Sequence, residues 1–408
     1  MQNPLKRWDV LLTLVMCVLM IPSERYEIFS LVEDQTIAAR HIMRNYLPDA
    51  NERVIRDDII VVALDEDLYE EYGSFPFRRT DLGTLAHTLS TFGARVVVLD
   101  FLMDFRSSYQ EDEPTAALFE ASDNVLLVSY AQFDGEYAGI TYPTEKLRAV
   151  TRSGYGNVEP TSAVIDNVAR LRIHERLTVN VDGWPLAIQA LAMYWDVSPR
   201  LEDDVLYFGS KIEVPLDQFG DIYIDFPMLD SGTQYLSEGR AGYSALEILD
   251  LDLDTLPEDE LEEYRSIFED RIVLVGDTWE VTHDKFNTPV GQVYGVEIIA
   301  NTINTIMNDA PLRPSGWFLE ISSMTIFLSV LLATSLIPAM ALRLLAVVGA
   351  YVTYILIAGS LYVYAGSVLS MSYAILTGFM VVIFASIRRY MVTEEKEKLS
   401  TADSVESN

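Results

Sequence analysis

The chain has 408 residues, half of them hydrophobic, and its 29 Lys and Arg against 61 Asp and Glu give a formal net charge of −32. Because a field of that sign repels nucleic acid, the composition argues against a nucleic-acid partner. The single cysteine excludes an intrachain disulfide, so a folded domain must be held together by its hydrophobic core.

Four apolar stretches bracket one long acidic block. The first covers residues 10–21, and the other three cover residues 317–338, 341–363 and 367–387. The last three have the ~20 apolar residues that a bilayer core requires. The first is shorter, so it has the length of either an uncleaved anchor or the apolar core of a cleaved signal peptide. Since no small-residue cleavage site follows it, we expect an anchor that continues as a helix through residues 26–45.

Basic residues beside the apolar stretches predict their orientation, because Lys and Arg stay on the cytoplasmic side. Lys6 and Arg7 precede the first stretch, Arg343 lies between the second and third, and Arg388 and Arg389 follow the last. We therefore expect a multi-pass protein of the bacterial plasma (inner) membrane, with both termini in the cytoplasm. The predicted parts are a stub and anchor (1–22), an extracytoplasmic domain (23–316), three transmembrane helices (317–387) and a short cytoplasmic tail (388–408).

Strand and helix patterns alternate in the acidic block. Continuous apolar runs predict strands buried on both faces, as in a parallel sheet, at Ile59–Leu64, Arg95–Leu99, Asn124–Ser129 and Arg271–Val275. Helical spacing predicts helices at Asp81–Phe92, which Gly93 ends, and at Trp184–Trp195, which is apolar nearly all round. The fold class is therefore an α/β domain, a largely parallel sheet with flanking helices, joined to four transmembrane α-helices, one N-terminal and three C-terminal.

Two further segments carry weaker patterns. Residues 222–226 alternate and predict a half-exposed strand, whereas residues 249–264 form a carboxylate-rich loop or helix edge.

Carboxylates follow two of the predicted strands. Asp65 and Asp67 come after the first, and Asp100 and Asp104 after the second. In open α/β sheets ligands bind at the carboxyl ends of strands, and Ca²⁺ and Mg²⁺ prefer such oxygen ligands. The alternative is that these residues cap helices and turns.

A third polar group follows the last predicted strand, where Asp277, His283 and Asp284 come after Gly276. It forms either a polar pocket or a hydrogen-bonded loop. The sequence contains no motif for a nucleotide or a haem, no H-E-x-x-H, no C-x-x-C and no G-x-S-x-G, so nothing in it argues for an enzyme.

Several segments, taken in order, resemble the type-two CHASE domain, the sensory extracellular domain associated with cyclases and histidine kinases. The resemblance covers nearly all of residues 25–315. The three C-terminal apolar stretches also resemble the transmembrane helices that commonly follow this domain in the family. The segments that carry it are Ile59–Asp67, Phe75–Arg79, Gly93–Phe101, Gly156–Val158, Asp166–Arg170, Trp184–Tyr194, Arg271–Asp277, Thr288–Pro289 and Gly295–Asn301.

The resemblance adds site residues. Arg79, Asp166 and Arg170 match family positions, where they either contact a ligand or form buried ion pairs. Asp284 also matches a family position and lies in the loop after the last predicted strand. The chain departs from the family at Phe75 and Phe77, where tryptophans are usual, at Arg78 for proline, at Asn167 for glycine and at Asp277 for a small residue. The complete set of ligand-binding candidates is Asp65, Arg79, Asp100, Asp166, Arg170, Asp277, His283 and Asp284.

Family membership implies a non-enzymatic sensor of an unidentified extracytoplasmic ligand, which signals through its membrane helices to a cytoplasmic output domain. Because residues 388–408 are too few for such a domain, we expect a separate protein partner or a homo-oligomer in the bilayer. The alternative is a structural accessory subunit of a larger membrane or cell-surface assembly, which docks through its acidic outer domain.

Overall fold

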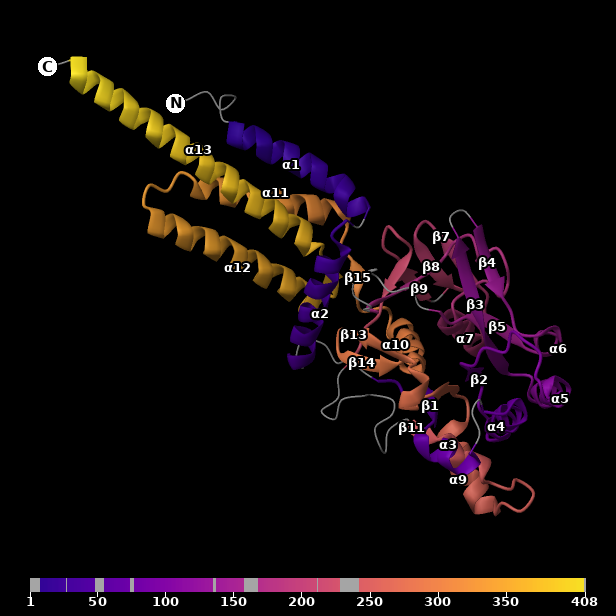
Figure 1. Cartoon of the computed structure of the whole chain (residues 1–408). Coiled ribbons are helices and arrows are strands. Elements are labelled where there is room, and N and C mark those ends of the chain that lie inside the picture. Colours follow the sequence, from indigo (N-terminus) through magenta and orange to yellow (C-terminus); the bar gives the residue numbers. More distant parts are fainter. Residues whose placement is uncertain are drawn as a thin grey trace. The chain divides into compact units, whose positions relative to one another are not determined.

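Two compact units make up the chain (Figure 1), and each is described separately. Residues 51–313 form one, which we call the α/β unit, and residues 1–50 with 314–408 form the other, the helical unit. The computed structural model describes residues 8–26, 28–47, 55–73, 77–134, 137–157, 168–210, 212–227 and 242–406.

A seven-stranded sheet forms the centre of the described part of the α/β unit, in the order β11-β1-β12-β2-β3-β4, with β5 also paired to β3. All pairs are parallel except β3 with β4. Every residue of β1 and β2 is buried, as continuous apolar runs predict. The strands are β1 (Ile59–Leu64), β2 (Val96–Leu99), β3 (Val125–Asp134), β4 (Tyr137–Thr141), β5 (Arg152–Tyr155), β11 (Gly242–Ser244) and β12 (Ile272–Asp277).

Helices cover both faces of this sheet, which produces two hydrophobic cores. One core joins the sheet to α7 (Leu186–Trp195) and α10 (Gly295–Met307). The other joins it to helices on the opposite face, which are α3 (Glu66–Tyr72), α4 (Arg79–Thr91), α5 (Asp112–Ser122), α6 (Glu145–Arg148), α8 (Ala245–Leu249) and α9 (Glu258–Phe268).

Short elements complete the α/β unit. Three small antiparallel sheets pair β6 (Arg170–Arg172) with β10 (Asp221–Tyr223), β8 (Val205–Phe208) with β7 (Pro199–Glu202) and β9 (Ile212–Pro215), and β13 (Lys285–Thr288) with β14 (Gly291–Tyr294). The 3₁₀ turn η3 covers Glu280–Thr282.

The predicted strands and helices of the sheet are confirmed, with ends that differ by a few residues. The prediction of a half-exposed strand at residues 222–226 is wrong. The strand β10 ends at Tyr223, and the buried residues of this segment are Ile222, Ile224, Asp225 and Phe226. Residues 249–264 contain the end of α8, a connection and the start of α9.

Three described helices of the helical unit are long and apolar enough to cross a membrane. They are α11 (Trp317–Thr334), α12 (Met340–Ala365) and α13 (Met371–Glu406), whose candidate span ends at Glu394. The two-residue strands β15 (Arg313–Pro314) and β16 (Ser367–Val368) precede α11 and α13.

The predicted fourth span is not supported. Helix α1 (Trp8–Arg25) packs on α13, but its apolar part, Val10–Met20, is too short to span a bilayer core. Nor does α1 continue through residues 26–45, because a turn at Tyr26 and Ile28 separates it from α2 (Ser30–Tyr46).

Candidate functional site

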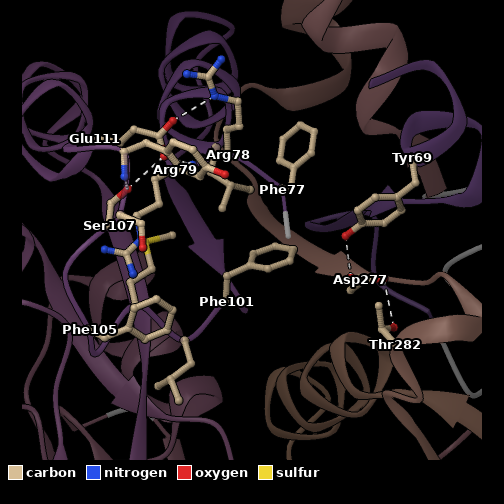
Figure 2. A pocket seen from close by; sticks show the side chains of 15 residues that line it. Tyr69, Phe77, Arg78, Arg79, Phe101, Phe105, Ser107, Glu111, Asp277 and Thr282 are labelled. Carbon is tan, nitrogen blue, oxygen red and sulfur yellow. Dashed lines mark hydrogen bonds and ion pairs between the residues drawn. The ribbon is translucent and has the colours of Figure 1, made fainter. Parts of the chain in front are cut away.

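A cavity of about 590 Å³ lies at the carboxyl edge of the central sheet. Its walls come from the segments that follow the neighbouring strands β1, β12 and β2, and from the start of α4. The lining residues are Tyr69, Phe77, Arg78, Arg79, Leu82, Phe101, Leu102, Met103, Phe105, Ser107, Ser108, Tyr109, Glu111, Asp277 and Thr282. We call this cavity the edge pocket (Figure 2).

The fold explains why these residues meet. Parallel strands end at the same edge of a sheet, and β12 lies between β1 and β2. Tyr69 therefore arrives on the helix after β1, Phe101 in the segment after β2, and Asp277 as the last residue of β12.

One end of the edge pocket is a fixed carboxylate. Asp277 accepts hydrogen bonds from the Tyr69 hydroxyl at 2.6 Å, the Trp279 backbone N–H at 3.0 Å and the Thr282 hydroxyl at 3.2 Å. Burial, with the hydrogen bond to Asp277 and its negative charge, raises the pKa of Tyr69, so its hydroxyl stays protonated and donates. The Tyr69 ring stacks on Trp279 with centroids 4.7 Å apart.

The other end holds two arginine–carboxylate pairs. Arg78 Nε lies 2.9 Å from Glu111 Oε1, and Arg79 Nη1 lies 2.5 Å from Asp112 Oδ1. Although burial by itself would raise the pKa of Glu111, hydrogen bonds from Arg78, Ser107 and the Arg79 backbone N–H bring it below its usual value. The Arg79 guanidinium also lies over the Phe105 ring, 4.9 Å from its centroid.

Aromatic side chains separate these two ends. Figure 2 shows Phe77 and Phe101 between the arginines and the Tyr69–Asp277 pair. An apolar slot with ionic groups at both ends suits a flat organic molecule that carries hydrogen-bonding groups.

Two more carboxylates interact electrostatically near this edge. Asp100 directly follows β2, and burial raises its pKa to about 7, with a further contribution from the charge of Asp284. Burial also raises the pKa of Asp284 to about 6; the charge of Asp277 adds to that shift and the Gly295 N–H opposes it. A Cβ on Gly295 would lie 2.7 Å from an Asp284 carboxylate oxygen, so only glycine allows this approach. Asp284 therefore interacts repulsively with two neighbouring carboxylates, those of Asp100 and Asp277.

The structure does not bring three of the four proposed metal ligands together in a metal site within the described residues. Asp65 caps α3, since its Oδ1 accepts from the Leu68 N–H at 3.1 Å, and Asp67 and Asp104 are exposed. No group of three His, Cys, Asp or Glu within the described ranges is placed to hold a metal ion. The capping alternative is thus confirmed for Asp65, and the metal hypothesis gains no support from the geometry.

The remaining candidates divide between the edge pocket and other places. Arg79 and Asp277 line it, while His283 is exposed at the end of η3 with φ 57° and does not. Arg170 on β6 is buried 3.4 Å from Asp217 and 3.2 Å from Asp221, as the ion-pair alternative predicts. Asp166 lies outside the described residues.

Sequence reasoning missed the aromatic walls and Glu111. The sequence did contain a signal for the aromatic walls, because Phe101 and Phe105 follow β2 within six residues. Asp100 and Asp104, which were chosen as candidates for that reason, lie in the same segment. Asp277, Phe77 and Arg78, where the chain departs from the family pattern, all line the edge pocket.

Comparison with known protein families gives one match, the CHASE2 domain, over residues 10–340. The chain belongs to the CHASE2 family. The CHASE2 match runs from α1 past the end of α11 and so includes the whole α/β unit. CHASE2 is a sensory domain, and with three C-terminal apolar helices it fits a membrane sensory role. No curated protein and no solved structure matches the chain.

Proposed function

We propose that this protein is a membrane receptor subunit whose edge pocket binds a small extracytoplasmic ligand, and whose membrane helices pass the event to a separate partner. The edge pocket carries the proposal. Its volume of about 590 Å³ falls within the ~300–1,000 Å³ typical of small-molecule sites. Its rim exposes apolar side chains to water, with Phe105 63% and Tyr109 78% exposed.

The ligand class follows from the lining. Aromatic walls favour a flat apolar body, and the polar groups at the two ends favour donors or acceptors at both ends of that body. Phe77, Arg78 and Asp277 differ from the family pattern, which supports a ligand particular to this chain.

Charge near the helices supports the orientation. In this proposal α11, α12 and α13 each cross the bilayer, so the α/β unit and the C-terminal end of α13 are on opposite sides. Arg343, Arg388 and Arg389 lie toward the end where α11 meets α12, which supports a cytoplasmic position for that end and an extracytoplasmic α/β unit in a plasma (inner) membrane.

A continuous helix supports signal transfer. Helix α13 runs unbroken from Met371 to Glu406, beyond its apolar part. Arg389 on α13 donates to the backbone carbonyls of Ile337 at 2.8 Å and Pro338 at 2.5 Å, which ties α13 to the α11–α12 turn. A displacement of the outer end of α13 would therefore also move its cytoplasmic end, where a partner protein binds.

The test is a ligand screen on the full-length protein in nanodiscs, read as a rise in melting temperature. A true ligand at 100 times its Kd stabilises by about 2.7 kcal/mol. Asp277→Asn and Phe101→Ser should reduce that rise, and the exposed change Glu262→Gln should leave it intact. A hit whose effect survives both pocket variants would place the binding site elsewhere.

A second candidate is a structural accessory subunit that docks through its acidic surface. The first turn of α9 favours it, because Glu258, Asp259 and Glu260 are all exposed there. Pull-down from native membranes separates the two candidates. A co-purified kinase or cyclase supports the receptor, whereas membrane or surface proteins in fixed ratio support the accessory subunit.

A further inference from the structure

Helix α2 of the helical unit buries most of its charged side chains and exposes several of its apolar ones. Positions three and four residues apart on one face are buried, and these are Asp34, Ile37, Arg40, His41 and Arg44. The arrangement is the reverse of a helix that packs on a water-soluble core.

The buried face is held by ionic and hydrogen-bonded contacts. Arg40 donates to the Leu369 carbonyl at 2.8 Å and pairs with Glu33 at 2.8 Å. Glu33 in turn accepts from the backbone N–H of Ser372 at 2.8 Å and from its hydroxyl at 2.6 Å. Rotation of α2 about its axis would leave these buried charges unpaired, so the contacts fix which face points outward.

Two further contacts hold the C-terminal half of α2. His41 Nδ1 lies 2.9 Å from the Tyr362 hydroxyl, and the Arg40 guanidinium lies over the same ring, 5.2 Å from its centroid. The contacts therefore extend along α2 from Glu33 to His41.

The outward face is an apolar stripe at helical spacing. Val32 is 42% exposed, Ile42 43%, Met43 38% and Tyr46 74%. The stripe carries no charged side chain, and Gln35 and Ala39 fill its remaining positions. A contiguous apolar face of this kind marks a binding surface and not a solvated one.

The contacts of α2 define its level along the membrane helices. Tyr362 lies in the last turn of α12, Ser372 in the first turn of α13, and a Cβ on Gly359 would be 3.4 Å from Met43 Cε. Gly359 is six residues before Ala365, or about 9 Å along the axis. Because α12 has 26 residues, it is about 39 Å long and exceeds the ~30 Å hydrocarbon core by about 9 Å. The contacts of α2 with α12 thus lie within the last ~9 Å of α12, and this level suits an interfacial helix, which binds at the boundary of headgroups and acyl chains.

We propose that α2 is an interfacial helix whose outward face, formed by Val32, Ile42 and Tyr46 with Met43 at the edge toward α12, inserts into the outer leaflet of the bilayer. The occupant is lipid, because the stripe is uncharged and lies at the level where α12 and α13 leave the membrane. A chain with net charge −32 is repelled by anionic headgroups, so apolar contact with zwitterionic lipid supplies the binding. The proposal requires membrane insertion of α11–α13 and does not depend on a ligand in the edge pocket.

The test uses the full-length protein with Cys17→Ser and one nitroxide-labelled cysteine, in phosphatidylcholine nanodiscs. The label is placed by Ile42→Cys, and by Tyr46→Cys as a second variant. Val348→Cys in α12 and Val179→Cys in the α/β unit are the references, being 51% and 83% exposed. We expect the ratio of oxygen to nickel-chelate collisions at Ile42 to exceed that at Val179 several-fold and to approach that at Val348.

Three results would overturn the proposal. Nickel-chelate collisions at both α2 positions equal to those at Val179 would mean that the face meets water. Dipolar broadening that disappears on dilution with unlabelled protein would mean that a second copy covers it. Low collision rates with both reagents and no broadening would mean that another part of the same chain covers it.

Discussion

Replacement of Asp100 by Asn tests whether the carboxylates at the sheet edge repel one another. Burial and the charge of Asp284 raise the pKa of Asp100 from 3.8 to about 7, so the folded protein binds a proton that the unfolded chain releases. Its contribution to stability is therefore complete below pH 3.8 and is lost as pH rises through 7. The α/β unit should become more stable as pH falls from 8 to 5.

The size of this effect follows from the linkage between proton binding and folding. A pKa change of this size corresponds to about 2 to 3 kcal/mol between pH 8 and pH 5. Because Asp100 is only partly buried, solvent screens part of that energy and we expect about 1 to 2 kcal/mol. A change of this size moves the melting temperature by about 3 to 6 °C in a unit of this length. Asp284, whose pKa is also raised, adds a change of the same sign.

The assay is thermal unfolding of the full-length protein in nanodiscs from pH 5 to pH 8, followed by tryptophan fluorescence. At pH 8 the Asp100→Asn variant should melt above the wild type, and the difference in melting temperature should become smaller as pH falls to 5. Glu262→Gln, an exposed carboxylate change, is the matched control and should behave as the wild type. A variant that keeps the full pH dependence would refute the reasoning.

Three other changes have defined outcomes. Arg170→Met removes the cation beside buried Asp217, while Asp221 keeps Arg172. The loss of about 3 to 5 kcal/mol in unfolding free energy should be partly recovered at low pH, where Asp217 is protonated; burial already raises the pKa of Asp217 with Arg170 present, and loss of Arg170 raises it further. Tyr69→Phe removes the hydrogen bond to the edge-pocket carboxylate and should cost about 1 to 3 kcal/mol by thermal unfolding; no loss would mean that water replaces the hydroxyl. Arg389→Gln loosens the α11–α12 turn and should speed proteolysis there, with an unchanged cleavage rate as the contrary result.

The central sheet was predictable from sequence because its strands are buried on both faces and read as unbroken apolar runs. Ile59–Leu64 is such a run, and its six residues are all buried. The position of Asp277 in the edge pocket was predictable for a related reason, since the carboxyl ends of parallel strands form the edge at which ligands bind.

The rest of the edge pocket depends on tertiary arrangement. Tyr69, Phe77 and Glu111 lie on three separate segments, and only the strand order brings them together. Asp65 could not be assigned from sequence either, because an aspartate after a strand gives the same pattern whether it caps a helix or binds a ligand. In the structure it caps α3. The prediction that α1 continues through residues 26–45 was wrong, because the chain turns between Arg25 and Ser30. The apolar pattern of α2 also does not show which of its faces other parts of the protein cover.

Strand order has a further consequence for how the α/β unit is made. β12 is the last strand of the sheet along the chain, yet it lies between β1 and β2, with Ile59 beside Ile272. Until residues 272–277 are available to pair, the facing edges of β1 and β2 have no partner. Long-range parallel pairing of this kind is slow and leaves strand edges open to misassembly. The α/β unit can therefore close its sheet only when nearly all of its chain is available.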